Sequence, residues 1–367
     1  MHMNYINAYN QIRRFTEADI PEVVRLRGKC FTRSAHGSIM ELETYFQEMF
    51  FRNPWHNDDI PSLVYMAGNG AIVGFLGTIV RPVHYKGNPL WMAVPTQLMA
   101  DPEYRGMCGF PLLRTFLAGP QDLSFTDVVN SSAKKMWTML GGATANLQSL
   151  RWTRPLRPSR LALRYFGSSR VLAALATAAK PFCMAVDSSL VRSERNPFYQ
   201  TRPDLEEREL DVPGLLECYQ ELGSRYSLSP SYESRTLEWL FQRLESRAAD
   251  RDLRRVVLRS VDGRLVGWYL YLTALGGIAQ TIQVGSHPAE SSLVFKHLYY
   301  DAWKQGSLAV SGGLQPEHLL TVTQPPGILT HVGSWTVVHS KNPALLRSVL
   351  DGDAWLTRLE GEWWMDF

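Results

Sequence analysis

The sequence predicts an α/β (α+β) protein that contains two copies of one structural plan. Its 367 residues exceed the usual size of one domain and suffice for two. Two landmarks recur at nearly the same offset. A proline at a helix start occurs at Pro21 and Pro213, 192 residues apart, and a glycine in a strand-like run occurs at Gly74 and Gly267, 193 residues apart. The agreement between these offsets indicates an internal duplication.

The elements of the first copy follow from local start and turn signals. A helix begins near Pro21, because an acidic segment and a proline precede an apolar run of helical period. Strands over 62–66 and 71–80 flank the turn Ala67-Gly68-Asn69-Gly70 and form a hairpin. The expected elements that follow are a strand over 96–100, a helix over 110–117, a strand ending at Asn130 and a helix ending at Leu140.

The second copy repeats this order. A helix follows Pro213, and a turn over 261–264 joins the hairpin strands. The expected strands are 255–260, 265–273 and 278–284, and the last of them precedes a helix over 291–303. The junction before that helix reads Gly285-Ser286-His287-Pro288, and its proline lacks a backbone N–H donor.

Composition limits the classes of protein that fit. A net charge of +3 gives no strong overall attraction to nucleic acid, so we expect no DNA partner. The four cysteines lie far apart without a C-x-x-C pair, which favours free thiols in a reducing compartment over disulfides or a metal site. The N-terminus has no secretory pattern, and the most apolar stretch, 171–186, is too short to span a bilayer. We therefore expect a cytoplasmic protein without a bound metal; the oligomeric state stays open.

The stretch from Leu98 to Gly142 carries most of the functional information. An extended apolar segment enters a turn that contains Arg105 and Gly106, and a helix follows at once. Such a junction directs several unpaired backbone N–H groups the same way, and the helix dipole adds to their field. The stretch therefore predicts a binding place for phosphate.

These residues also resemble a known family. The turn Pro102-x-Tyr104-Arg105-Gly106, followed by Asn130-x-x-Ala133-x-x-Met136-Trp137-x-x-Leu140-Gly141, resembles the GNAT superfamily of acyl-CoA-dependent N-acyltransferases. The resemblance departs from the usual Arg/Gln-x-x-Gly-x-Gly/Ala loop, because Cys108 and Phe110 stand where small residues are expected. It implies two tandem GNAT-like domains, each a mixed, mostly antiparallel sheet flanked by helices. We place them at 1–150 and 204–367, joined by a basic helical linker over 151–203.

The resemblance implies acetyl-CoA or another acyl-CoA as co-substrate, bound by the first copy only. The strand before the turn would hold the thioester, the turn would hold the pyrophosphate, and the end of the next strand would line the pantetheine arm. The resemblance therefore implies the following cofactor-binding residues: Leu98, Met99, Ala100, Arg105, Gly106, Met107, Cys108, Gly109, Phe110, Asn130 and Ala133. The second copy, with His287-Pro288 at its junction, would form one wall of an acceptor pocket or serve stability alone.

Catalytic and acceptor-binding residues are less clear. The family often has a tyrosine acid where this chain has Trp137, which we expect in the core. His84, Gln97 and Glu103 are weak candidates for a general base, so the catalytic group stays unassigned. The loop over 50–59 is a candidate acceptor site. Its proposed substrate contacts are Trp55, His56 and Asp58. Alternatively, Trp55 packs into the hydrophobic core.

Three functions fit these observations. The first is an acyl-CoA-dependent N-acyltransferase that acts on an amine of a small molecule, amino sugar or peptide. The second is a carrier-dependent transferase similar to the FemABX peptidyltransferases, which use aminoacyl-tRNA; the third is a non-catalytic binding module. Six arginines within 151–170 bear on the second of these functions. They either belong to an ordered linker, in which their charges are paired or solvated, or form a docking surface for RNA or anionic lipid.

Overall fold

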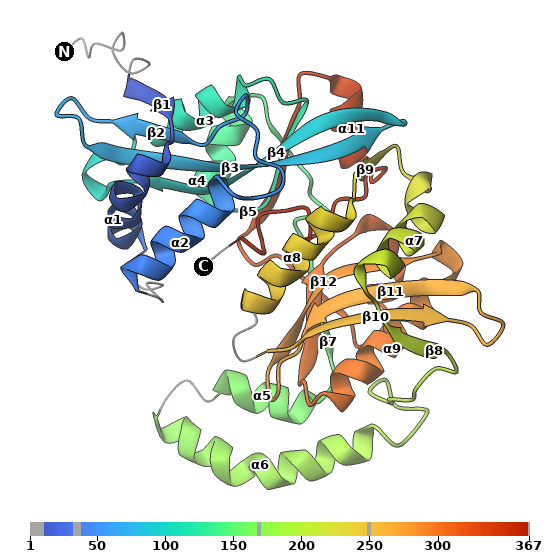
Figure 1. Ribbon diagram of the computed structural model, residues 1–367. Helices are drawn as coiled ribbons and strands as arrows, with labels where there is room; N and C mark the ends of the chain where they lie inside the picture. Colours follow the sequence, from blue (N-terminus) through green and yellow to red (C-terminus); the bar gives the residue numbers. More distant parts are fainter. Residues whose placement is uncertain (1–10, 32–37, 167–169, 248–250, 366–367) are drawn as a thin grey trace.

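The computed structural model describes residues 11–31, 38–166, 170–247 and 251–365. It contains two mixed sheets that lie side by side, each covered by helices (Figure 1). The predicted α/β class and the two-copy plan are confirmed.

The first sheet has the strand order β1-β2-β3-β4-β5-β15-β6, and β9 pairs with the far end of β3. Among the described strands of this sheet, β4 and β5 form the parallel pair and the other pairs are antiparallel. Its strands are β1 (Ile12–Arg14), β2 (Leu63–Met66), β3 (Ile72–Tyr85), β4 (Asn88–Ala100), β5 (Leu123–Val129), β6 (Ala143–Thr144), β9 (Leu228–Pro230) and β15 (Trp335–His339).

Alternating side chains of β3 build a core on each face of this sheet. Phe75 and Ile79 face a core shared with α1 and α2, while Leu76 and Val80 face a core shared with α3 and α4. All four side chains are almost completely buried. The helices of this half are α1 (Ile20–Cys30), α2 (Ile39–Phe50), α3 (Gly109–Leu117), α4 (Ser131–Met139) and α11 (Pro343–Leu350).

The second sheet has the order β14-β7-β13-β12-β11-β10-β8, and its described pairs are antiparallel except β12–β13. Its strands are β7 (Arg151–Pro155), β8 (Glu206–Glu209), β10 (Leu253–Arg259), β11 (Leu265–Leu272), β12 (Ile278–Ser286), β13 (Ala309–Gly313) and β14 (Ile328–Thr330). The helices are α5 (Pro158–Phe166), α6 (Arg170–Leu190), α7 (Val212–Leu222), α8 (Ser234–Arg247), α9 (Ser291–Lys304) and α10 (Leu319–Val322). Hairpin β10–β11 repeats hairpin β2–β3, and the parallel pair β12–β13 repeats β4–β5.

The two sheets exchange strands. β7 follows the first copy in sequence, yet it lies between β13 and β14 of the second sheet. β15 follows the second copy, yet it lies between β5 and β6 of the first sheet. The domain boundaries at residues 150 and 203 stay a prediction. The first sheet combines strands from before residue 150 and after residue 203, and the second sheet takes β7 from the segment between them.

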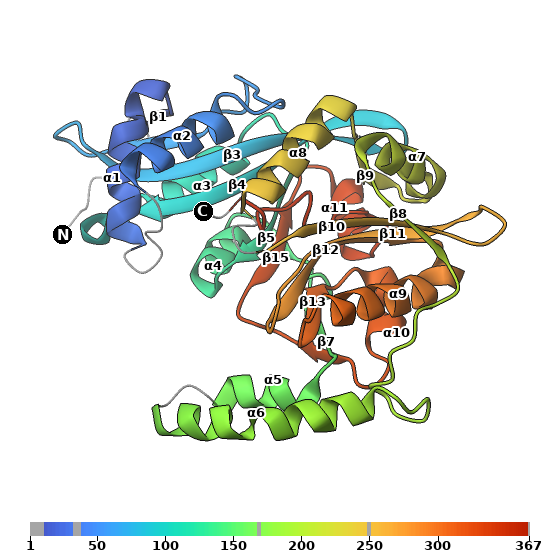
Figure 2. The same ribbon diagram turned by 60° about the horizontal axis from the view of Figure 1, so that its bottom comes forward.

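The segment 151–203 is therefore not a purely helical linker as predicted. Its first five residues form β7, because alternation along this strand turns the Trp152 indole into the core of the second domain, where it contacts Phe295. The sequence did not indicate this strand, because arginines occupy two of its five positions. α5 and α6 make up its helical part and lie along one side of the second sheet (Figure 2).

Most arginines of this segment are engaged within the protein. The Arg154, Arg157 and Arg164 guanidinium groups donate to backbone carbonyls. The Arg160 guanidinium pairs with Asp187 at 3.0 Å. This arrangement supports the ordered-linker interpretation over an RNA or lipid docking surface. Within the described residues, no helix combines the length and apolar character needed to cross a membrane.

Candidate functional site

The parallel strands β4 and β5 diverge and leave a cleft. They pair only at Met92–Leu123 and Ala93–Ser124, and beyond these positions a cavity of about 860 Å³ opens between them. A register shift against β3 and a positive φ of 50° at Gln97 mark a bulge in β4 at this opening. Nine of the predicted cofactor residues line the cavity: Leu98, Met99, Ala100, Arg105, Gly106, Gly109, Phe110, Asn130 and Ala133.

The turn at the mouth of this cleft is open enough for an anion. Gly106 has a φ of +88°, and no atom lies within 4 Å of the place where a Cβ would stand. α3 begins directly after, at Gly109, and Gly109 and Phe110 line the same cavity with backbone N–H groups from the first turn of the helix, where Pro111 has none. The Phe110 ring lines the cavity and leaves it open. The residues present therefore fit a diphosphate at this corner.

Two residues of the predicted turn lie outside the cavity lining. The Cys108 side chain is fully buried, and its Sγ lies 3.6 Å from the carbonyl oxygens of Val73 and Tyr104. Burial raises the pKa of the Cys108 thiol to about 11, so it stays protonated and is no nucleophile. The Met107 side chain is exposed. Both residues can contribute only main-chain groups to the turn.

The opposite wall of the cleft is formed by the start of α4. The Asn130 side-chain oxygen accepts hydrogen bonds from the backbone N–H groups of Ser132 (3.0 Å) and Ala133 (2.9 Å), so Asn130 is the N-cap of this helix. The Trp137 side chain is 2% exposed and belongs to the core, as predicted.

A carboxylate that the sequence did not indicate bridges the two diverging strands. Glu362 Oε1 accepts the backbone N–H of Gln97 at 3.1 Å, and Glu362 Oε2 accepts the Thr126 hydroxyl at 2.7 Å. The C-terminal segment brings this side chain to the bulge of β4. It can do so only with a glycine before Glu362, since a Cβ on Gly361 would overlap the Asp127 side chain.

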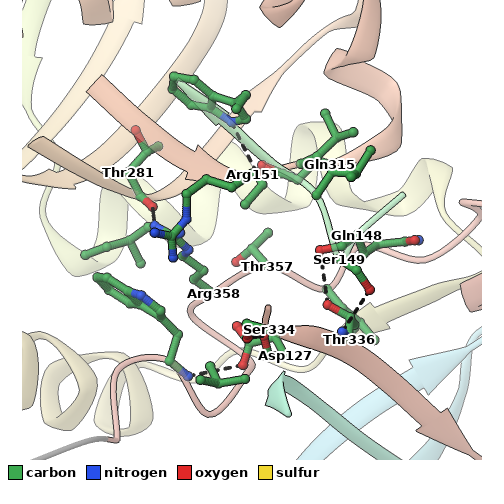
Figure 3. A pocket seen from close by; sticks show the side chains of 18 of the residues that line it. Asp127, Gln148, Ser149, Arg151, Thr281, Gln315, Ser334, Thr336, Thr357 and Arg358 are labelled. Carbon is green, nitrogen blue, oxygen red and sulfur yellow. Dashed lines mark hydrogen bonds between the residues drawn. The ribbon is translucent and has the colours of Figure 1, made fainter. Parts of the chain in front are cut away.

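A second cavity of about 390 Å³ lies between the two domains (Figure 3). Its walls come from β5, from the two crossing segments near Ser149 and Ser334, and from the C-terminal segment near Thr357. The second domain contributes the place where β12 and β13 diverge after the pair Thr281–Gly312. Val128 of β5 lines both cavities, so they share a wall.

Asp127 lies at that shared wall, on the side of the inter-domain cavity. Its Oδ1 accepts the backbone N–H groups of Glu362 (2.7 Å) and Trp363 (3.1 Å). Burial raises the pKa of Asp127 to about 6, although the positive charge of Arg358 and the two amide bonds act in the opposite direction. Among the described residues, Oδ2 has no hydrogen-bond partner. A carboxylate with these properties can accept a proton near neutral pH.

The three base candidates from the sequence are placed differently. His84 lies at the far end of β3, paired with Pro89 and with Ser229 of β9, so it is remote from the cleft. Glu103 is exposed and outside the lining. Gln97 lines the cleft, but its amide nitrogen donates to the Tyr45 hydroxyl at 2.8 Å. The structure brings none of these three to a proton-accepting position; among the described residues, Asp127 and Glu362 supply the carboxylates there.

The predicted acceptor loop also lies elsewhere. Trp55 is 7% exposed and is stacked under the Arg81 guanidinium at 3.9 Å, so it closes the core, as the alternative reading held. His56 Nδ1 lies 2.9 Å from the Phe50 carbonyl oxygen. Together with Asp58, these residues line a separate hollow of about 260 Å³ that lacks the residues of the cleft.

Comparisons by structure find similar proteins, whereas no protein-family model and no curated protein sequence matches the chain. A GCN5-related N-acetyltransferase from Anabaena variabilis ATCC 29413 has a TM-score of 0.58 at 12% identity, over 90% of this chain and 73% of that chain. A probable N-acyltransferase from Enterococcus faecalis V583 has a TM-score of 0.57 at 12% identity, over 90% and 72%. Saccharomyces cerevisiae N-myristoyltransferase with bound myristoyl-CoA has a TM-score of 0.50 at 11% identity, over 89% and 77%.

These matches cover both halves of the chain in one superposition. In this chain the bulge of β4, the divergence of β4 from β5 and the turn into α3 occur in the order that the sequence resemblance implies. The chain therefore has the fold of the GCN5-related N-acetyltransferases, present as two tandem domains.

Proposed function

We propose that the protein is an acyl-CoA-dependent N-acyltransferase. The observation that carries this proposal is the cavity between β4 and β5 with the open Gly106 turn at its mouth. Arg105 and the first amides of α3 would hold the diphosphate of CoA, and Asn130 and Ala133 would line its pantetheine arm. Bound acyl-CoA would supply the activated acyl group as a thioester near Gln97. The neighbours described as N-acyltransferases, one with bound myristoyl-CoA, support this class of donor.

The acceptor amine would enter through the inter-domain cavity. Asp127 would accept the proton that the amine loses as its nitrogen bonds to the acyl carbon, while the carbon–sulfur bond breaks and CoA leaves as a thiolate. The Gln97 N–H, which now donates to Glu362, would donate to the carbonyl oxygen as negative charge develops there. The two cavities adjoin at Val128, and the acceptor amine would have to pass this residue to reach the thioester.

Calorimetry with acetyl-CoA, myristoyl-CoA and CoA tests the proposal. We expect at least one acyl-CoA to bind to the wild-type protein, and we expect Gly106→Trp to abolish binding by filling the turn. Gly70→Trp is the matched control, because Gly70 has a φ of +85° and equally open surroundings but lies in the β2–β3 turn. No binding at millimolar ligand, or equal loss in both variants, would refute the proposal.

A further inference from the structure

The inter-domain cavity carries an unusual set of charges for its size. Three charged side chains line it: Asp127 from β5, Arg151 from β7 and Arg358 from the C-terminal segment (Figure 3). The other described residues of its lining are uncharged. With Asp127 ionised, the lining carries one more positive than negative charge.

Arg151 lacks a counter-ion among the described residues. It is half-buried, and desolvation lowers its pKa. Its guanidinium has no hydrogen-bond or ion-pair partner within the described part of the chain, whereas Arg154, Arg157, Arg160 and Arg164 all have one. A buried charge is costly unless it is paired, so an unpaired guanidinium in a cavity indicates an anionic ligand.

Arg358 reinforces the positive end of the cavity. Its guanidinium donates to the carbonyl oxygen of Thr281 at 2.9 Å and lies 4.6 Å from the centre of the Trp363 ring. These contacts hold the Arg358 guanidinium in place at the cavity. The Arg151 guanidinium can form two parallel hydrogen bonds to a carboxylate or phosphate group.

Asp127 supplies the negative charge in the lining of this cavity. Its Oδ2 has no partner among the described residues and is available to an ammonium or amine group. Asp127 and Arg151 come from different sheets, and both line the same cavity. A volume of about 390 Å³ suits a small molecule.

We propose that the acceptor is a small amine that also carries an anionic group, a carboxylate or a phosphate monoester. Its nitrogen would lie at Asp127 and its anionic group at Arg151, beside Arg358. This inference rests on the proposed function for the role of the amine as acceptor. The binding of such a molecule to the cavity can nevertheless be measured without any acyl transfer.

The test is calorimetry with matched pairs of amines that differ in the anionic group. Suitable pairs are L-phenylalanine with 2-phenylethylamine, 4-aminobutyrate with butylamine, and O-phosphoethanolamine with ethanolamine. We expect the anionic member of at least one pair to bind at least tenfold more tightly than its partner, and the pair that responds distinguishes carboxylate from phosphate. Arg151→Gln should remove this preference, since a charge-assisted hydrogen bond contributes about 1.5–3 kcal/mol, or roughly 10- to 150-fold.

Two further variants make the result specific. Arg164→Gln removes an exposed arginine of α5 and should leave the preference intact, and Arg151→Lys should restore part of it. Equal binding of both members in every pair, no binding of any amine, or a preference that persists in Arg151→Gln would overturn the inference. Binding of CoA, measured separately, decides the proposed function, so either idea can fail alone.

Discussion

At the scale of single residues, the surroundings of Asp127 have opposing effects on the pKa of its carboxyl group. Burial favours the neutral acid, while Arg358 and two backbone N–H groups favour the anion. The resulting pKa of about 6 lies above the ordinary value of 3.8, so folding favours the protonated form between these values. Above pH 6 the group is ionised and can accept a proton from an amine.

We expect kcat at saturating substrates to rise with pH through an inflection near pH 6, because Asp127 must be ionised to act as a base. Asp127→Asn should remove this inflection and lower kcat by about 100-fold or more. Steady-state pH profiles measure both effects. Glu103→Gln, which changes an exposed carboxylate beside the turn, should keep the inflection; an inflection that survives in Asp127→Asn would exclude Asp127 as the base.

Prediction from sequence succeeded for residues whose roles depend on near neighbours. The turn around Gly106 is a local feature, so the motif alone placed it before a helix. Asn130 was placed at the end of a strand by the same kind of local pattern, and the structure shows that it caps the helix that follows. Asp127 was seen only as part of a strand end, and Glu362 gave no signal at all. Their positions depend on the return of the C-terminal segment to β5, which no local pattern encodes.

At the scale of elements, the bulge of β4 and the C-terminal segment act together. The bulge turns the Gln97 N–H toward the cleft, where Glu362 accepts it. An acyl-CoA carbonyl that takes this donor must displace a charge-assisted hydrogen bond. In the proposed complex the segment would therefore oppose binding of the acyl group but not of CoA itself, which lacks the thioester carbonyl.

Glu362→Ala tests this competition. We expect its affinity for acetyl-CoA to increase by about tenfold or more, since the displaced bond contributes about 1.5 kcal/mol or more. Its affinity for CoA should stay unchanged, and paired calorimetric titrations measure the difference. An equal change for both ligands would show that Glu362 acts on the cleft generally and does not compete for the Gln97 N–H.

At the scale of the whole molecule, strand exchange joins the two domains. The first sheet contains β9 and β15 from the C-terminal half of the chain, and the second sheet contains β7, which follows the first copy. The β15 side chains Val337 and Val338 are fully buried in the first domain. The domains therefore cannot be completed independently.

We expect a chain cut after Leu150 to lose cooperative folding in both halves. Residues 1–150 lack β15, which leaves the edge of β5 unpaired, and residues 151–367 contain β15 without its partners. Circular dichroism melting of each half, and of the two mixed, measures the effect, and mixing should restore a cooperative transition and CoA binding. A cooperative melt of 1–150 alone would show that β15 is dispensable.

The duplication was visible in the sequence, whereas the exchange was not. Equal offsets at Pro21/Pro213 and Gly74/Gly267 reveal repeated elements because each depends on its own turn and cap signals. Which copy pairs with β7 or β15 depends on the edges left open after both sheets have formed. β7 and β15 are each only five residues long, so the alternation along them does not assign the partner.

The position of β15 also governs how the protein is made. As the chain leaves the ribosome, β5 emerges roughly 200 residues before the strand that covers its edge. At about 5–20 residues per second, that interval lasts about 10–40 seconds, during which the nascent first sheet exposes an open edge. Holding chaperones have their greatest opportunity in this interval, and a stalled or truncated translation product would aggregate through that edge.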